Sequence, residues 1–86
     1  MIHKLKTHPL YFEKILEGVK NFEIRKNDRD YKICDELILK EYVPTAFYLS
    51  GDRYTGRILH RRIDYILYGG QFGIEEGYCV MSLSSI

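Results

Sequence analysis

Gly18-Val19-Lys20-Asn21-Phe22-Glu23-Ile24-Arg25 is the stretch that decides the fold, because a helix ends and a strand begins within it. Glycine is favoured where a helix ends in a residue with positive φ. In the strand that follows, neighbouring side chains point to opposite faces, so Glu23 and Arg25 share one face. We expect Phe22 and Ile24 to face the core, and the charged face to line a cleft.

Length and charge describe one small domain with little overall charge. The 86 residues form a single domain, 1–86, in which 45% of residues are hydrophobic, and the formal net charge is +1. That charge does not by itself indicate a nucleic-acid-binding protein. Between Arg53 and Arg62, however, lie four arginines, one histidine and no acid. This run is either a solvated strand face or a basic surface for phosphates.

The two cysteines, Cys34 and Cys79, are far apart and form no CxxC pair, so we expect no metal site, no disulfide framework and no cofactor. Unpaired cysteines without a signal peptide favour a reducing, cytoplasmic location. Residues 1–6 lack an apolar run, and no stretch approaches the roughly 18 apolar residues of a membrane span. We therefore expect no membrane association.

The N-terminal part of the chain predicts a strand over residues 2–6 and one helix over residues 9–17. Proline suits the first turn of a helix, so either Thr7 or His8 is the N-cap, and threonine is the better chemical choice. The apolar stripe expected to face the core consists of Tyr11, Phe12, Ile15 and Leu16.

The rest of the chain has the period of two that is typical of strands. Strands are predicted at 36–42, 54–68 and 78–83, the last of them apolar enough for an interior position. A glycine-rich loop at 69–77 precedes the last strand and lacks the spacing of a phosphate-binding motif. One helix with several strands joined by turns predicts an α+β, mainly β domain: a small barrel whose N-terminal helix covers one opening.

Arg61 lies on the more apolar face of the strand predicted at 54–68. An unpaired buried guanidinium is costly, so Arg61 needs a carboxylate partner, for which Glu23 is a candidate, or a wet cleft. The alternative is a bulge near Gly56 or His60 that changes which residues face inward.

Gly18, Lys20, Glu23 and Arg25 fit the pattern G-x-K-x-x-E-x-R. This pattern resembles the signature of the ASCH domain (activating signal cointegrator homology), within the PUA-like superfamily. Further stretches resemble a compact, uncharacterised bacterial and phage family of ASCH-like proteins; they are Leu5–Thr7, Phe22–Arg29, Tyr54–Arg57 and Gly69–Gly73.

The resemblance implies a PUA-like β-barrel with a cleft between helix and sheet that binds RNA or a nucleotide-like ligand. The arginines would contact phosphates through their planar forks, and Phe72 could stack on a base. The residues expected to bind the ligand are Lys20, Glu23, Arg25, Arg57, Arg61 and Phe72. We expect a binding module more than an enzyme.

One alternative is a small hydrolase acting on a modified nucleoside or on RNA, with Glu23 as the general base and Lys20 as the electrostatic stabiliser or acid. One branch of ASCH relatives hydrolyses N4-acetylcytidine with a Lys, a Thr and a Glu, and another relative is a ribonuclease. In that branch the Thr lies three residues after the Lys, where this chain has Glu23. Neighbouring cations also stabilise an ionised carboxylate and make it a weaker proton acceptor, which argues against Glu23 as the general base.

A second alternative is a protein-interaction or regulatory module. The loop predicted at 44–53 contains Phe47, Tyr48 and Leu49 in a row. Three adjacent apolar side chains in a loop either dock on the domain itself or contact a protein partner.

Overall fold

One five-stranded sheet, in the order β1-β3-β4-β5-β2, forms most of the molecule. The computed structural model describes residues 1–44 and 53–86. Its elements are β1 (Ile2–Thr7), α1 (Pro9–Leu16), β2 (Phe22–Lys26), β3 (Glu36–Tyr42), β4 (Tyr54–Tyr68) and β5 (Tyr78–Ser85). β1 pairs with β3 in parallel, and the other neighbours are antiparallel. The predicted strands are confirmed, and β5 is interior as expected.

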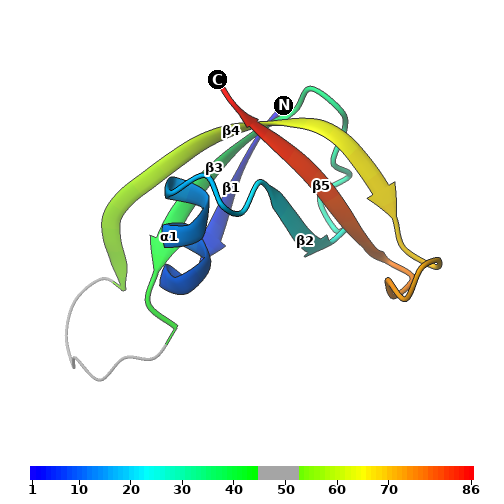
Figure 1. Cartoon of the computed structure of the whole chain (residues 1–86), viewed down its shortest axis with the longest axis horizontal. Helices are drawn as coiled ribbons and strands as arrows, with labels where there is room; N and C mark the ends of the chain where they lie inside the picture. Colours follow the sequence, from blue (N-terminus) through cyan, green and yellow to red (C-terminus); the bar gives the residue numbers. More distant parts are fainter. Residues whose placement is uncertain (45–52) are drawn as a thin grey trace.

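The sheet curls into a half-barrel. Figure 1 shows β4 arching across the molecule, with α1 beneath its first half and β2 beneath its second half. The sheet is mainly β with one short helix, which confirms the expected α+β, mainly β class. The edge strands β1 and β2 are joined in sequence through α1, so the helix lies at the opening between them.

Arginine side chains link the two edges of the half-barrel. Arg25 Nη2 of β2 donates to the carbonyl of Lys6 at 3.0 Å and to Thr7 Oγ1 at 3.5 Å. Arg29 Nη1 donates to the carbonyl of Lys4 at 2.9 Å. Carbonyls on the free edge of β1 thus accept side-chain hydrogen bonds instead of a strand ladder, which also protects this edge from pairing with another chain.

The N-cap of helix α1 is His8 and not Thr7, the residue that chemistry favoured. His8 Nδ1 accepts a hydrogen bond from the Leu10 amide at 3.1 Å. Thr7 is the last residue of β1 and is buried, so its side chain faces the interior and cannot cap the helix. Gly18 follows the helix with φ 81°, which confirms it as the helix stop.

The expected apolar stripe of α1 is only partly correct. Phe12 and Ile15 are buried, whereas Tyr11 and Leu16 are about half exposed. An eight-residue helix at an open edge has one partner, the sheet, and therefore buries a narrow face.

Two irregularities determine which side chains of β4 face the core. A register shift opposite Lys40–Tyr42 spans Gly56, which has φ 95°, so a bulge near Gly56 is confirmed. Arg61 nevertheless pairs with the core residue Leu37 and stays on the core face. A second shift, between Ile63 and Tyr65, was not expected; it exposes Tyr65 and buries Ile66.

The glycine-rich loop joins β4 to β5 as predicted. A Cβ on Gly69 would lie 1.9 Å from the Glu75 carbonyl oxygen, so only glycine fits there. Among the described residues, no helix has both the length and the apolar character needed to cross a bilayer.

Candidate functional site

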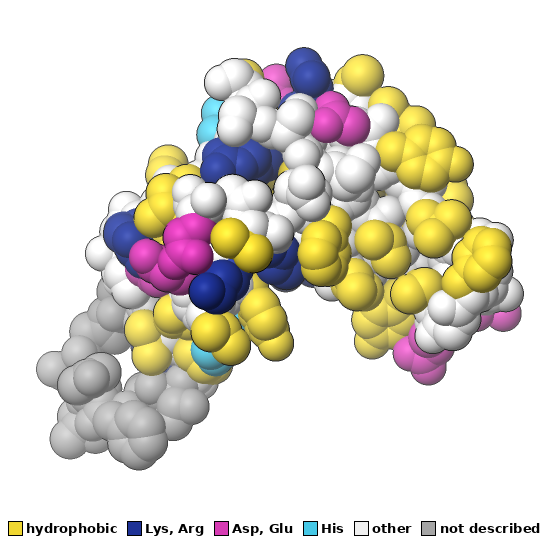
Figure 2. Space-filling model, viewed as in Figure 1, with side chains coloured by type: hydrophobic (Ala, Val, Ile, Leu, Met, Phe, Trp, Pro, Cys, Tyr) yellow, Lys and Arg dark blue, Asp and Glu magenta, His cyan; other side chains and the backbone are white. Residues whose placement is uncertain are grey.

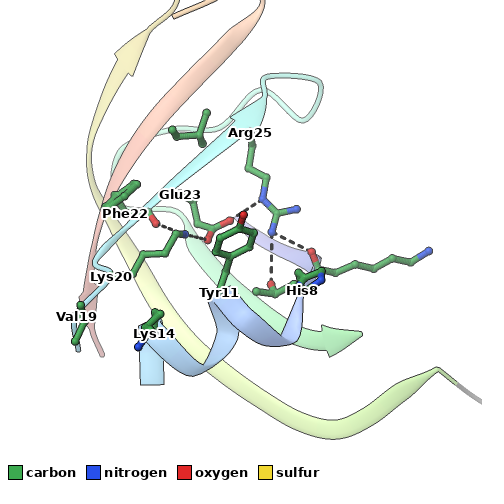
Figure 3. A pocket seen from close by; sticks show the side chains of 11 residues that line it. His8, Tyr11, Lys14, Val19, Lys20, Phe22, Glu23 and Arg25 are labelled. Atoms are coloured by element: carbon green, nitrogen blue, oxygen red, sulfur yellow. Dashed lines mark hydrogen bonds and ion pairs between the residues drawn. The ribbon is translucent and has the colours of Figure 1, made fainter. Parts of the chain in front are cut away.

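A pocket of about 760 Å³ opens where the end of β1, helix α1 and strand β2 meet. Figure 3 shows it from close by, and the hollow between the two halves of the molecule is visible in Figure 2. The lining residues are Lys6, Thr7, His8, Tyr11, Lys14, Val19, Lys20, Phe22, Glu23, Ile24 and Arg25. Four of these are Lys or Arg, against one carboxylate, so the pocket favours an anionic ligand.

Glu23 lies at the centre of the site, and the residue is 4% exposed. Lys20 Nζ donates to Oε1 at 2.6 Å, and Arg25 Nε donates to Oε2 at 2.7 Å. Figure 3 shows the two cations approaching the carboxylate from opposite sides. Each oxygen of an ionised carboxylate has two acceptor positions, so Glu23 keeps acceptor capacity for a ligand.

Glu23 and Arg25 share one face of β2, as the period of two predicts, but that face is the inner one. Glu23 pairs with Met81 and Arg25 with Cys79, both core residues with no exposed surface. The expectation that Phe22 and Ile24 face the core is wrong, because they are 40% and 51% exposed. A carboxylate can occupy the inner face because two cations compensate its charge.

The pocket wall combines cations with an aromatic ring. Tyr11 is half exposed, and Lys20 Nζ lies 5.6 Å from its ring centre and 5.0 Å from that of Phe22. Lys14 has a contact of 3.4 Å with exposed Glu17, an ion pair that contributes little. Lys14 therefore lines the pocket without a strong partner among the described residues.

Arg61 does not join this pocket. Its Nη1 donates to the carbonyl of His60 at 2.9 Å, and Nη2 lies 3.5 Å from the carbonyl of Ile15 near the end of α1. Glu23 is therefore not its partner. The C-terminal end of a helix carries a partial negative charge, so a cation at this place is favourable. Arg61 lines a neighbouring cavity of about 220 Å³, to which Lys20 also contributes.

Arg57 lies in a separate cluster around Glu41. Its Nε and Nη2 donate to the buried Glu41 carboxylate at 3.0 Å each, and Nη2 also reaches Glu13 of α1 at 2.8 Å. The hydrogen bonds from Arg57, with one from Thr55, outweigh burial and hold the pKa of Glu41 below its ordinary value. This cluster fastens α1 to the sheet.

Phe72 does not line the pocket either. It is 84% exposed in the loop between β4 and β5, with φ 52°. Of the six expected ligand-binding residues, the structure brings three together in the large pocket: Lys20, Glu23 and Arg25.

The run from Arg53 to Arg62 is not a free basic surface. Arg53 donates to the carbonyl of Val43, Arg62 pairs with Asp64 at 3.1 Å, and His60 lies 2.6 Å from Glu36. These partners come from other strands or from beyond the run, so a scan of the run alone does not find them. The run is therefore better described as a solvated strand face than as a basic surface for phosphates.

Sequence reasoning missed the other eight residues that line the pocket: Lys6, Thr7, His8, Tyr11, Lys14, Val19, Phe22 and Ile24. Tyr11 was assigned to the core because it fits the helical stripe. Thr7 and Lys6 end a strand that is distant in sequence from the motif, and Arg25 contacts both. The sequence signal for them is the one-residue link, His8, between the end of β1 and the start of α1.

The residues expected for a protein-interaction site, Phe47, Tyr48 and Leu49, lie outside the described residues. Within 1–44 and 53–86, no three His, Cys, Asp or Glu side chains are grouped as metal ligands.

Comparison with known proteins gives a family without a described activity. Residues 2–83 match the family described as "Domain of unknown function (DUF3850)". The chain is also similar to the "Uncharacterized 12.9 kDa protein in GpA 3'region" of Escherichia phage P2, at 45% identity over 62 residues. That match takes in 72% of this chain and 50% of the phage protein, so the chain spans about half the length of this relative. Because the family match extends over nearly the whole chain, this protein belongs to the DUF3850 family.

Proposed function

We propose that this protein is an RNA- or nucleotide-binding module, and that its curled sheet and covering helix are a PUA-like barrel of the ASCH type. The observation that carries the proposal is the buried Glu23 carboxylate, held between Lys20 and Arg25 on the floor of an open, cation-rich pocket. The same three residues, together with Gly18, carry the G-x-K-x-x-E-x-R resemblance.

The pocket offers one type of contact for each part of a nucleotide. Lys14 and Lys6 supply cations for phosphate, as nucleic-acid binding requires. Tyr11 supplies an exposed ring on which a base can stack, an interaction of about 1–3 kcal/mol. Glu23 supplies an acceptor for an exocyclic amino group of the base.

The hydrolase alternative has less support. A general base must be free to take a proton from its substrate, whereas each oxygen of Glu23 already accepts a short hydrogen bond from a cation. A carboxylate held in this way is better suited to ligand recognition than to proton transfer.

Binding of short single-stranded RNA and of nucleoside monophosphates, measured by fluorescence anisotropy and calorimetry, tests the proposal. With about three phosphate contacts, Kd for RNA should rise about twentyfold between about 50 and 200 mM salt. Lys20→Ala and Arg25→Ala should each weaken binding about tenfold or more, because each removes a charged partner from the pocket.

Lys26→Ala is the matched control, since Lys26 is an exposed cation on the same strand outside the pocket. It should change Kd less than about twofold. The proposal fails if neither RNA nor nucleotides bind, or if all three variants weaken binding equally. Cleavage of the ligand in the same samples, lost in Glu23→Gln, would favour the hydrolase instead.

A further inference from the structure

The outer face of the sheet changes character along β4. On its first half, three cross-strand rows each contain charged residues: Ile2–Glu36–Arg62, Lys4–Ile38–His60 and Lys6–Lys40–Ile58. After the bulge at Asp64, two rows run across β4, β5 and β2 instead: Tyr65–Ser82–Phe22 and Leu67–Val80–Ile24. Neither of these rows contains a charged residue.

These two rows, with Tyr78 beside them, form what we call the apolar face: Phe22, Ile24, Tyr65, Leu67, Tyr78, Val80 and Ser82. Tyr65 is 61% exposed, Ile24 51% and Phe22 40%. Figure 2 shows hydrophobic side chains gathered over this part of the molecule, where β5, β2 and the end of β4 lie. An uncharged, contiguous face of this kind indicates a site for another protein surface.

The exposed area matches what a small dimer needs. At roughly 150–250 Å² for a whole aromatic side chain, the apolar face leaves on the order of 500 Å² of apolar surface on each copy. Two copies would bury about 1,000 Å² of apolar surface plus a polar rim, which reaches the lower range of specific interfaces. The two central rows are uncharged, and the cation beside them, Lys26, pairs with Tyr78 at the end of the edge strand β2, so the centres of two copies meet without electrostatic repulsion.

We propose that the apolar face binds a second copy of this chain, as a symmetric dimer in which the two sheets pack face to face. In a two-fold interface the same patch serves both copies, and stacked sheets lie about 10 Å apart. Tyr65, Phe22 and Tyr78 are the aromatic anchors of the contact. The inference does not rest on the proposed function: of the three anchors, Phe22 also lines the pocket, whereas Tyr65 and Tyr78 lie outside it.

The dimer would place two ligand pockets beside the interface. β2 sends Glu23 and Arg25 to the pocket floor and turns Phe22 and Ile24 toward the apolar face. Phe22 and Ile24 also line the pocket rim, so the partner copy would form a continuation of that rim.

Sedimentation and light scattering, at concentrations from micromolar to millimolar, test the dimer. The mass should rise from 10.2 kDa toward twice that value. Tyr65→Glu should weaken self-association about tenfold or more, because it buries a charge at the centre of the contact. Ile58→Glu is the matched control: Ile58 is 56% exposed on the same sheet but in a charged row, and this variant should dimerise as the wild type does.

A cysteine crosslink gives a second, independent measurement. Ser82 pairs with both Phe22 and Tyr65 at the centre of the face. Sheets about 10 Å apart keep the two Cα atoms beyond the roughly 7 Å reach of a disulfide, so a short bifunctional maleimide is the suitable reagent. In a Cys34→Ser background, Ser82→Cys should be crosslinked by it to a covalent dimer, and Ser82→Cys with Tyr65→Glu should be crosslinked much less. The proposal is overturned if the wild type is a monomer throughout, or if Tyr65→Glu and Ile58→Glu change the mass equally.

Discussion

Replacement of Glu23 by glutamine tests the central interaction of the site. The side chain keeps its shape but loses its charge, so Lys20 Nζ and Arg25 Nε lose the carboxylate that they contact at 2.6 and 2.7 Å. The amide can accept from one of them, while its NH₂ group is turned toward the other donor. We expect the folded state to lose stability although no atom is removed from the core.

The magnitude follows from burial. Removing one partner of a fully buried ion pair costs about 3–5 kcal/mol. Here the Lys20 and Arg25 side chains are 17% and 25% exposed, so water compensates part of the loss. A hydrogen bond to a charged group contributes about 1.5–3 kcal/mol. We therefore expect the free energy of unfolding to fall by about 2 kcal/mol, which for a domain of this size lowers Tm by about 8–16 °C.

Urea and thermal unfolding followed by circular dichroism measure this loss. Glu17→Gln is the matched control, because the Glu17 side chain is 45% exposed and only 3.4 Å from Lys14. It should change stability by less than about 0.5 kcal/mol. If Glu23→Gln unfolds as the wild type does, water already compensates the Glu23 carboxylate and the ion pairs contribute no stability.

Three further predictions concern other parts of the molecule. Burial alone would raise the pKa of Asp35, but hydrogen bonds from His3, the Met1 amino group and the Lys32 amide hold it below its ordinary value of 3.8. The resulting stability is present above that value and is lost as the pH falls through the lowered one, so urea unfolding should show less acid destabilisation in Asp35→Asn than in the wild type. A thiol reagent should label exposed Cys34 in the native protein, whereas Cys79 should react only on unfolding, because burial raises the pKa of its thiol; equal rates would contradict this. Arg57→Ala should lower Tm more than Arg62→Ala does, since it leaves the buried Glu41 without its cation; equal Tm values would show that the cluster around Glu41 does not fasten α1.

Local sequence predicts the elements well because their signals are local. Gly18 ends the helix through its positive φ, and the alternation of Leu37 and Leu39 predicts β3 with its buried face. Residue type favoured Thr7 over His8 as the cap, because threonine is a preferred N-cap residue and histidine is not. Only the packing of β1 against the core buries Thr7 and leaves His8 free to cap.

The candidate site was predicted only in part, because only part of its signal is local in the sequence. The spacing of Glu23 and Arg25 places them on one face, whatever the rest of the chain does. Arg61 was grouped with them because it lies on the inward face of its strand, and Arg57 was expected to contact the same ligand. Their partners, the end of α1 for Arg61 and Glu13 with Glu41 for Arg57, lie far away in sequence. No local pattern distinguishes a paired arginine from a free one.

The sequence by itself therefore determined the order of elements, their approximate ends and which charged residues share a strand face. The tertiary structure alone decided that this face points inward, toward Met81. The physical reason is that alternation fixes only which side chains lie together. Which of the two sets of side chains is buried depends on contacts made only in the folded structure. Here Lys20 and Arg25 compensate the charge of Glu23, a side chain that alternation alone would place in water.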